Sequence, residues 1–84
     1  MTTEDSRSVV LGLLRQIAPE ANLDAIDPER DLRREIDLDS LDFQSLIEMV
    51  AASTGVEVPE TDYPQVRSLS GLADYVAARL DTRA

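Results

Sequence analysis

The chain has 84 residues and a formal net charge of −9, from 17 acidic residues against eight arginines, with no Lys, His or Cys. Its length predicts a single domain over residues 1–84 with a small core, in which a deep, water-excluding active site is hard to build. We therefore expect no catalytic residues and no enzymatic activity. The missing residue types exclude disulfides, Ser-His-Asp triads and Cys or His zinc sites, and the acidic balance disfavours nucleic acid.

The N-terminus is polar and acidic, without the basic and apolar regions of a signal peptide. No apolar run approaches the roughly 20 residues that a membrane-spanning helix needs. We expect a cytoplasmic protein that does not insert into membranes.

The first helix is predicted over residues 4–18. Four apolar residues recur there at helical spacing on one face: Val10, Leu13, Leu14 and Ile17. Thr3, Asp5 or Ser6 is the expected cap, and Pro19 ends the helix because the residue before proline disfavours helical geometry. Residues 1–5 and 82–84 are expected to fray.

No helical period holds from residue 19 to residue 39. A loop of this length is uncommon in a small domain and indicates a hidden element, for which a helical turn around residues 28–30 is the candidate. Five apolar residues predict that the loop packs over the core: Leu23, Ile26, Leu32, Ile36 and Leu38.

A second helix is predicted over residues 40–53. Its apolar face consists of Phe43, Leu46, Ile47 and Val50. Asp39 or Ser40 stands where an N-cap belongs, Asp42 suits the helix dipole in the first turn, and Gly55 is a plausible end.

After this helix, residues 56–59 read as an extended connector, and residues 60–63 as one helical turn with which Pro64 interferes. A last helix is predicted over residues 69–81, with Ser68 as its N-cap. Its apolar residues are Leu69, Leu72, Tyr75, Val76 and Leu80. The pattern predicts an all-α fold: a small antiparallel bundle of three main helices, with a short third-helix turn and a long packed loop between the first two helices.

Ser40 has two compatible interpretations. It can cap the helix, since Ser and Asp are among the commonest caps. It can also be a covalent attachment point, because a hydroxyl at an exposed helix start ringed by acids is open to an enzyme with a basic surface.

Acidic residues gather around this serine, and no basic residue occurs from Glu35 to Val66. The acids in that stretch are Glu35, Asp37, Asp39, Asp42, Glu48, Glu57, Glu60 and Asp62. Such a patch can be a solvated face that aids solubility or a docking surface for basic partners. Its position around Ser40 favours docking. A calcium site at Asp37 and Asp39 is disfavoured because the spacing of a calcium loop is missing, so no metal site is predicted.

Asp39-Ser40-Leu41, followed by an amphipathic helix, resembles the signature of acyl carrier proteins. The segments on both sides also resemble that family. They are Leu32 to Leu38 before the serine, and Val58-Pro59-Glu60 and Ser68 to Val76 after it. The resemblance implies a 4′-phosphopantetheine arm on Ser40, which holds an acyl group as a thioester. It also implies that Asp39 orients the site and that Leu41 anchors the first turn and touches partners.

The same resemblance implies a set of partners. A holo-carrier-protein synthase, which is a phosphopantetheinyl transferase, would attach the arm from coenzyme A. Acyl-loading and acyl-processing enzymes with basic surfaces would then dock a monomeric carrier. The expected docking residues are Asp42, Glu48, Glu35 and Asp37. An acyl chain could slip between the helices past Leu46, Ile47, Val50, Leu72 and Val76, although ordinary core packing explains each of these residues equally.

The chain also departs from the family pattern. Asp37 stands where the family usually has a glycine, and Asp tolerates left-handed geometry better than most residues. Ser45 replaces a usual acid, and Arg33-Arg34 is unusual so near the serine, either paired with Asp31, Glu35 or Asp37 or adjusting partner choice.

Two departures on the second helix weaken an assignment to general fatty-acid synthesis: Ser45 and the uncharged run Ala51-Ala52-Ser53, which stands where the family has a later acidic run. The cargo could serve fatty-acid, polyketide or specialised secondary metabolism. An aminoacyl or D-alanyl type of carrier is an alternative, and so is an acidic helical interaction module that carries no arm.

Overall fold

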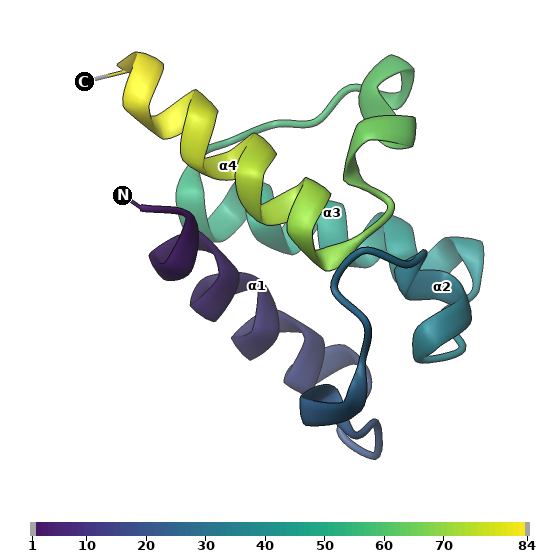
Figure 1. Cartoon of the computed structure of the whole chain (residues 1–84). Helices are drawn as coiled ribbons and strands as arrows, with labels where there is room; N and C mark the ends of the chain where they lie inside the picture. Colours follow the sequence, from purple (N-terminus) through teal and green to yellow (C-terminus); the bar gives the residue numbers. More distant parts are fainter. Residues whose placement is uncertain (1, 84) are drawn as a thin grey trace.

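The computed structural model describes the backbone of residues 2–83 and the side chains of residues 2–80. Within that range it is all-helical, as predicted (Figure 1). Three α-helices have 15 residues each: α1 (Thr3–Ile17), α3 (Ser40–Thr54) and α4 (Leu69–Arg83). Three shorter elements lie between them: the 3-10 helix η1 (Leu23–Ala25), α2 (Leu32–Glu35) and the 3-10 helix η2 (Glu60–Val66).

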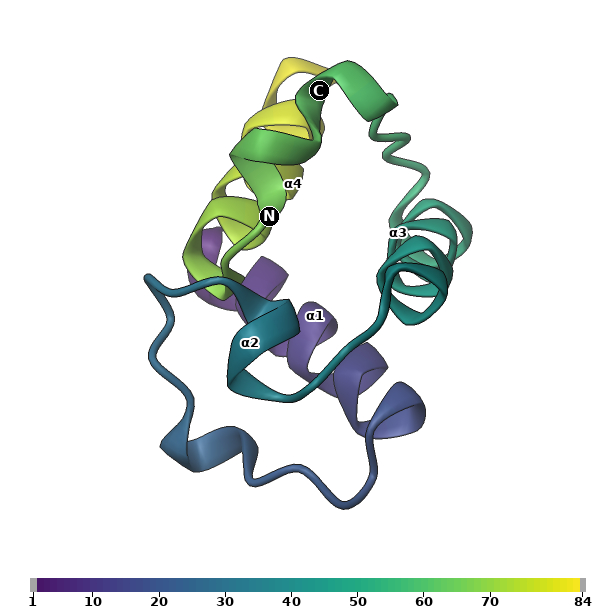
Figure 2. The ribbon, with the colours of Figure 1, turned by 90° about the vertical axis from the view of Figure 1, so that its right-hand side faces the viewer.

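The three long helices enclose one apolar core. α1 packs against both α3 and α4, and Figures 1 and 2 show α1 and α4 running antiparallel, with the two ends of the chain on the same side. The apolar residues predicted on helical faces are buried or pack against the core, and Leu14, Leu46, Leu72 and Val76 are fully enclosed. Each such side chain contributes about 1.5–3 kcal/mol to folding.

The ends of the helices differ from the predictions. α1 begins at Thr3 because Thr2 caps it: the Thr2 hydroxyl accepts the Asp5 N–H, and the Asp5 carboxylate accepts the Thr2 N–H. The predicted cap at Thr3, Asp5 or Ser6 is therefore wrong, and residues 3–5 are helical rather than frayed. α4 continues to Arg83, past the predicted end at residue 81, and Ala84 lies outside the described residues.

The long loop packs on the core, as predicted. Leu32 and Leu38 are buried, and Leu23, Ile26 and Ile36 are partly buried against the core. The hidden helical elements are η1 and α2, however, and residues 28–30 form a non-helical turn. Short apolar contacts, rather than a helical period, therefore hold this loop in place.

Backbone hydrogen bonds tie the loop to the start of α4. The Leu32 N–H donates to the Arg67 carbonyl at 2.7 Å, and the Ser70 N–H donates to the Pro28 carbonyl at 2.9 Å. Ser68 caps α4 as predicted, since its hydroxyl accepts the Gly71 N–H at 2.9 Å. The loop and the η2–α4 junction thus form one connected unit.

η2 is longer than the single turn predicted for residues 60–63, because it passes through Pro64 to the fully buried Val66. The fixed φ of proline fits 3-10 geometry, and the missing N–H removes only one bond. The connector before it, residues 56–59, has no regular structure, as predicted, and buries Val56 and Val58.

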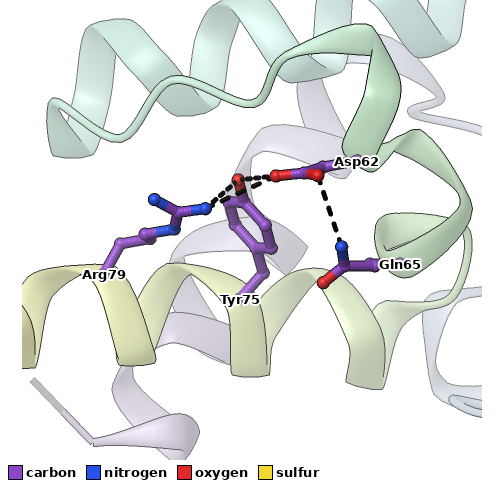
Figure 3. A network of polar contacts seen from close by, with 4 residues as sticks. All are labelled: Asp62, Gln65, Tyr75 and Arg79. Atoms are coloured by element: carbon purple, nitrogen blue, oxygen red, sulfur yellow. Dashed lines mark hydrogen bonds and ion pairs between the residues drawn. The ribbon is translucent and has the colours of Figure 1, made fainter.

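A polar network holds η2 against α4 (Figure 3). The Tyr75 hydroxyl donates to the Asp62 carboxylate at 2.7 Å and accepts from the Arg79 guanidinium at 2.8 Å. Arg79 also lies 3.4 Å from that carboxylate and 4.7 Å from the centre of the Tyr75 ring, and Gln65 donates to the other Asp62 oxygen. Asp62 is therefore engaged inside the fold instead of facing partners.

Replacing Gly71 by Ala should destabilise the protein by about 1–3 kcal/mol, because a Cβ there would collide with the backbone carbonyl oxygen of Gln65. Urea unfolding measures the change. Gly12→Ala is the matched control, since an added Cβ at this position inside α1 would meet nothing within 4 Å apart from its chain neighbours and the backbone of its own helix. That variant should gain up to about 1 kcal/mol from helix propensity. Equal effects of the two substitutions would contradict the packing described here.

High pH should weaken the η2–α4 contact through Tyr75. Burial, and then the bond to Asp62, raise the pKa of the Tyr75 hydroxyl, and the Arg79 charge partly lowers it. Because the folded pKa lies above the unfolded value of 10.0, this stabilisation is complete below pH 10.0 and is lost as the pH rises through the folded pKa.

Urea midpoints measured from about pH 8 to pH 11 should fall more steeply for the wild type than for Tyr75→Phe. The chain has no Lys or Cys, whose side chains would otherwise titrate in this range. Parallel pH profiles for the two proteins would show that Tyr75 contributes nothing to this dependence.

Candidate functional site

The start of α3 is held by Asp39. This residue has extended backbone geometry, with φ −84° and ψ 178°, and its carboxylate oxygen Oδ1 accepts the Asp42 N–H at 2.8 Å. Of the two predicted candidates, Asp39 is thus the N-cap. The other end of α3 is also as predicted, since Gly55 ends it with φ 76°.

Ser40 is the first residue of α3 and is exposed to solvent. Within residues 2–80 its hydroxyl takes part in no hydrogen bond, so the interpretation of Ser40 as the cap is wrong. Because Asp39 performs the capping, the Ser40 oxygen has no structural task and is available for reaction.

Asp37 sets the direction in which the chain approaches α3. It has φ 54°, the left-handed conformation expected where the family has glycine. The Leu38 N–H donates to the Arg33 carbonyl at 3.1 Å, which closes the Schellman motif at the end of α2. This sharp turn buries Leu38 and leaves Asp39 and Ser40 exposed.

The outer face of α3 is a stripe of exposed residues, which we call the α3 stripe: Leu41, Gln44, Ser45 and Glu48. They follow helical spacing, opposite the buried residues of the same helix. Leu41 is 71% exposed, so it does not anchor the first turn as the resemblance implied, but it can touch a partner. An exposed leucine between acids is suited to contact with a surface that is both apolar and basic.

The predicted docking acids differ in their exposure. Asp37, Asp39 and Glu48 are exposed, whereas Asp42 and Glu35 are half-buried. The Glu35 oxygen Oε1 accepts the Asp27 N–H at 2.7 Å, so this carboxylate already fastens the loop. Glu35 is therefore the least available for a partner among the four predicted docking residues.

Two hollows flank Leu38. One, of about 730 Å³, lies beside the loop and is lined by Glu35, Asp37 and Asp42 among other residues. The other, of about 530 Å³, is lined by Asp31, Arg33, Arg34, Leu38, Phe43, Tyr63 and Arg67. We call the second hollow the arginine groove.

The arginine groove was not predicted. The expected pairing of Arg33 and Arg34 with Asp31, Glu35 or Asp37 is wrong, since no such ion pair occurs among the described side chains. Only the doubled arginine was visible in the sequence, because Arg67 reaches the groove through the bond between Leu32 and the Arg67 carbonyl.

The residues suggested as an acyl-chain lining are Leu46, Ile47, Val50, Leu72 and Val76, and each is at most 5% exposed. They belong to the apolar core, which agrees with the prediction that ordinary core packing explains each of them. None of the described helices has the length and apolar character needed to cross a bilayer.

Comparison with known families gives a match over most of the chain. The family described as "Phosphopantetheine attachment site" matches residues 8–76, which include all of α3 and the start of α4 as far as Val76. A comparison with curated proteins gives no match. Carrier domains of this family are generally non-catalytic and interact with phosphopantetheinyl transferases and acyl-processing enzymes. The chain therefore belongs to the phosphopantetheine attachment-site family and is a carrier protein whose cofactor is 4′-phosphopantetheine.

Proposed function

We propose that Ser40 is the attachment point of the arm and that the protein presents an acyl thioester to successive enzymes. One observation carries this proposal: the Ser40 hydroxyl is exposed and makes no hydrogen bond within residues 2–80, while Asp39 caps the helix. An enzyme can therefore modify this hydroxyl without breaking a hydrogen bond to the rest of the described chain.

The local chemistry fits a phosphate ester on Ser40. The N-terminus of α3 presents unpaired backbone N–H groups and the positive end of the helix dipole, which favour a phosphate. In the transfer from coenzyme A, the Ser40 oxygen loses its proton and forms a bond to the phosphorus that carries the pantetheine arm. The P–O–P bond of the coenzyme A pyrophosphate breaks at the same time, and adenosine 3′,5′-bisphosphate leaves. The arm supplies a terminal thiol that holds the acyl group as a thioester.

Partner docking is proposed for the α3 stripe and its flanking acids. Leu41 offers an apolar contact, and Asp39, Asp42 and Glu48 offer negative charge to basic partners. Glu48 lies eight residues after Ser40, about 12 Å along the helix, so one partner surface could span both. Exposed ion pairs contribute under about 1 kcal/mol each and are screened by salt. Weak contacts suit a carrier that must leave each enzyme.

The cargo is proposed to be an acyl group of specialised metabolism. Ser45 and the uncharged run Ala51-Ala52-Ser53 stand where the common fatty-acid carriers have acids, so the α3 stripe is less acidic than theirs. Fatty acyl, polyketide and aminoacyl groups can each be carried as a thioester on such an arm. A cytoplasmic, monomeric carrier is the form that we propose.

Incubation with coenzyme A, magnesium and a promiscuous phosphopantetheinyl transferase should add one phosphopantetheine group to the wild type. Intact mass measures the gain. Ser40→Ala should gain nothing, whereas Ser53→Ala, an exposed serine near the other end of the same helix and outside the α3 stripe, should be modified like the wild type. No gain in the folded wild type, beside a proven carrier as positive control, would favour an interaction module without an arm.

Two substitutions of Asp39 should separate capping from recognition. Asp39→Ala should lower the free energy of unfolding by about 0.5–2 kcal/mol, because the cap is lost, while Asp39→Asn should nearly preserve it. Both should slow modification by the transferase, because both remove the charge next to Ser40. Urea unfolding and initial rates measure the two effects. If Asp39→Asn were modified at the wild-type rate, the charge of Asp39 would have no part in recognition.

A further inference from the structure

The arginine groove brings positive charge close to the start of α3. Three guanidinium groups against one carboxylate leave its lining with a net formal charge of +2, in a chain whose net charge is −9. The side chains of Arg33, Arg34 and Arg67 are exposed, and none forms an ion pair within residues 2–80. The one acid, Asp31, uses its oxygen Oδ1 to accept the Arg33 backbone N–H at 2.9 Å. The three positive charges are thus available to an added anion.

The groove is built on fixed backbone. Arg33 and Arg34 lie in α2, which Asp31 caps and Asp37 ends. Arg67 is held opposite them by the 2.7 Å bond from Leu32 to its carbonyl and by the bridge between Asp31 and Ser68. The convergence of the arginines therefore depends on the tertiary fold and does not need a partner to create it.

The rest of the groove is apolar. Leu38 and Phe43 are each 6% exposed, and the rings of Phe43 and Tyr63 meet edge to face with centroids 5.5 Å apart. A ligand that fits this lining has an apolar part for the aromatic rings and an anionic end for the arginines. Inorganic phosphate or a bare phosphodiester would leave the apolar part unused.

The groove also lies close to the proposed attachment point. Leu38 precedes Ser40 by two residues, so their Cα atoms are at most about 7 Å apart. Phe43 follows Ser40 by three residues on α3. A group tethered at Ser40 would meet the groove at an effective concentration in the mM range, so weak contacts would suffice.

We propose that the arginine groove binds the free carboxylate of a dicarboxylic acyl group carried on the arm, an inference that rests on the proposed attachment at Ser40. The methylene chain lies against Phe43 and Tyr63, and the terminal carboxylate meets the arginines. Guanidinium groups bind carboxylates by paired, charge-assisted hydrogen bonds, which a neutral acyl end cannot form. The groove thereby selects the cargo by the charge at its end.

The test loads the full chain with three arms that differ only in cargo. A promiscuous transferase attaches the arm from coenzyme A, from valeryl-coenzyme A or from glutaryl-coenzyme A, and intact mass verifies each product. Valeryl and glutaryl groups have equal carbon counts but end in a methyl group and a carboxylate. Amide and guanidinium NMR signals of Arg33, Arg34 and Arg67 are then compared in the ¹⁵N-labelled protein.

We expect shifts of these arginine signals in the glutaryl form only, and their loss at about 0.5 M salt, where exposed charges are screened. The triple variant Arg33→Gln, Arg34→Gln, Arg67→Gln should lose the glutaryl-specific shifts of the Leu38 and Phe43 amides. Arg15→Gln is the matched control, an exposed arginine on α1 outside the groove, and should retain them.

The other outcomes overturn the inference. Arginine signals that shift equally in all three loaded forms, relative to the unmodified chain, would mean that the phosphate of the arm occupies the groove. Equal shifts with valeryl and glutaryl groups alone would mean an apolar site without charge selection. No shifts, or glutaryl-specific shifts that survive in the triple variant, would mean that the arginines do not bind the carboxylate. Failure of the wild type to gain any arm is a different result, because it removes the proposed function and this inference with it.

Discussion

The arrangement of the chain before α3 depends on how Leu32 is anchored. Its side chain is fully buried, and its backbone N–H donates to the Arg67 carbonyl at 2.7 Å. This anchor fixes α2 beside the η2–α4 junction, and the left-handed Asp37 at the end of α2 then turns the chain toward α3. Leu38 is buried as a consequence, while Asp39 and Ser40 are exposed. The burial of Leu32, the first residue of α2, thus helps to decide where Ser40 lies.

The proposed attachment at Ser40 leaves helix capping and modification to two different residues, Asp39 and Ser40. A capping oxygen is engaged with a backbone N–H, so its reaction would weaken the helix that presents it. Here the cap is a carboxylate with no role as a nucleophile, and the neighbouring hydroxyl is left without a hydrogen bond to the described residues. The proposed modification of Ser40 would therefore leave the start of the helix intact.

The fold also redistributes the charges of an acidic chain. Asp62 and Glu35, which look available in the sequence, are engaged with Tyr75 and Arg79 and with the loop backbone. Asp37 and Asp42 line the hollow on one side of Leu38, and three arginines line the arginine groove on its other side. Surfaces of opposite sign thus lie on either side of the approach to Ser40, one suited to basic partners and one to an anion.

Features that depend on residues close together in the sequence could be predicted without the structure. Apolar spacing predicted α1, α3 and α4 to within two residues at each end, and Gly55, Asp37 and Ser68 were assigned correct backbone roles. These features depend on hydrogen bonds and side-chain contacts over at most a few residues, so a short stretch of sequence contains what is needed to infer them. The same holds for the exposed start of α3, where an Asp-Ser pair precedes an amphipathic helix.

Contacts between distant segments decided the rest. The lengths of α2 and η2 follow from the burial of Leu32 and Val66, and the arginine groove exists because Arg67 is brought against α2. One local feature also needed the structure: Asp and Ser are equally good caps, and only the geometry shows that the Asp39 oxygen accepts the Asp42 N–H. Sequence periodicity reports which face of a helix is apolar, but it does not report which loop covers that face, and the groove beside Ser40 depends on that covering loop.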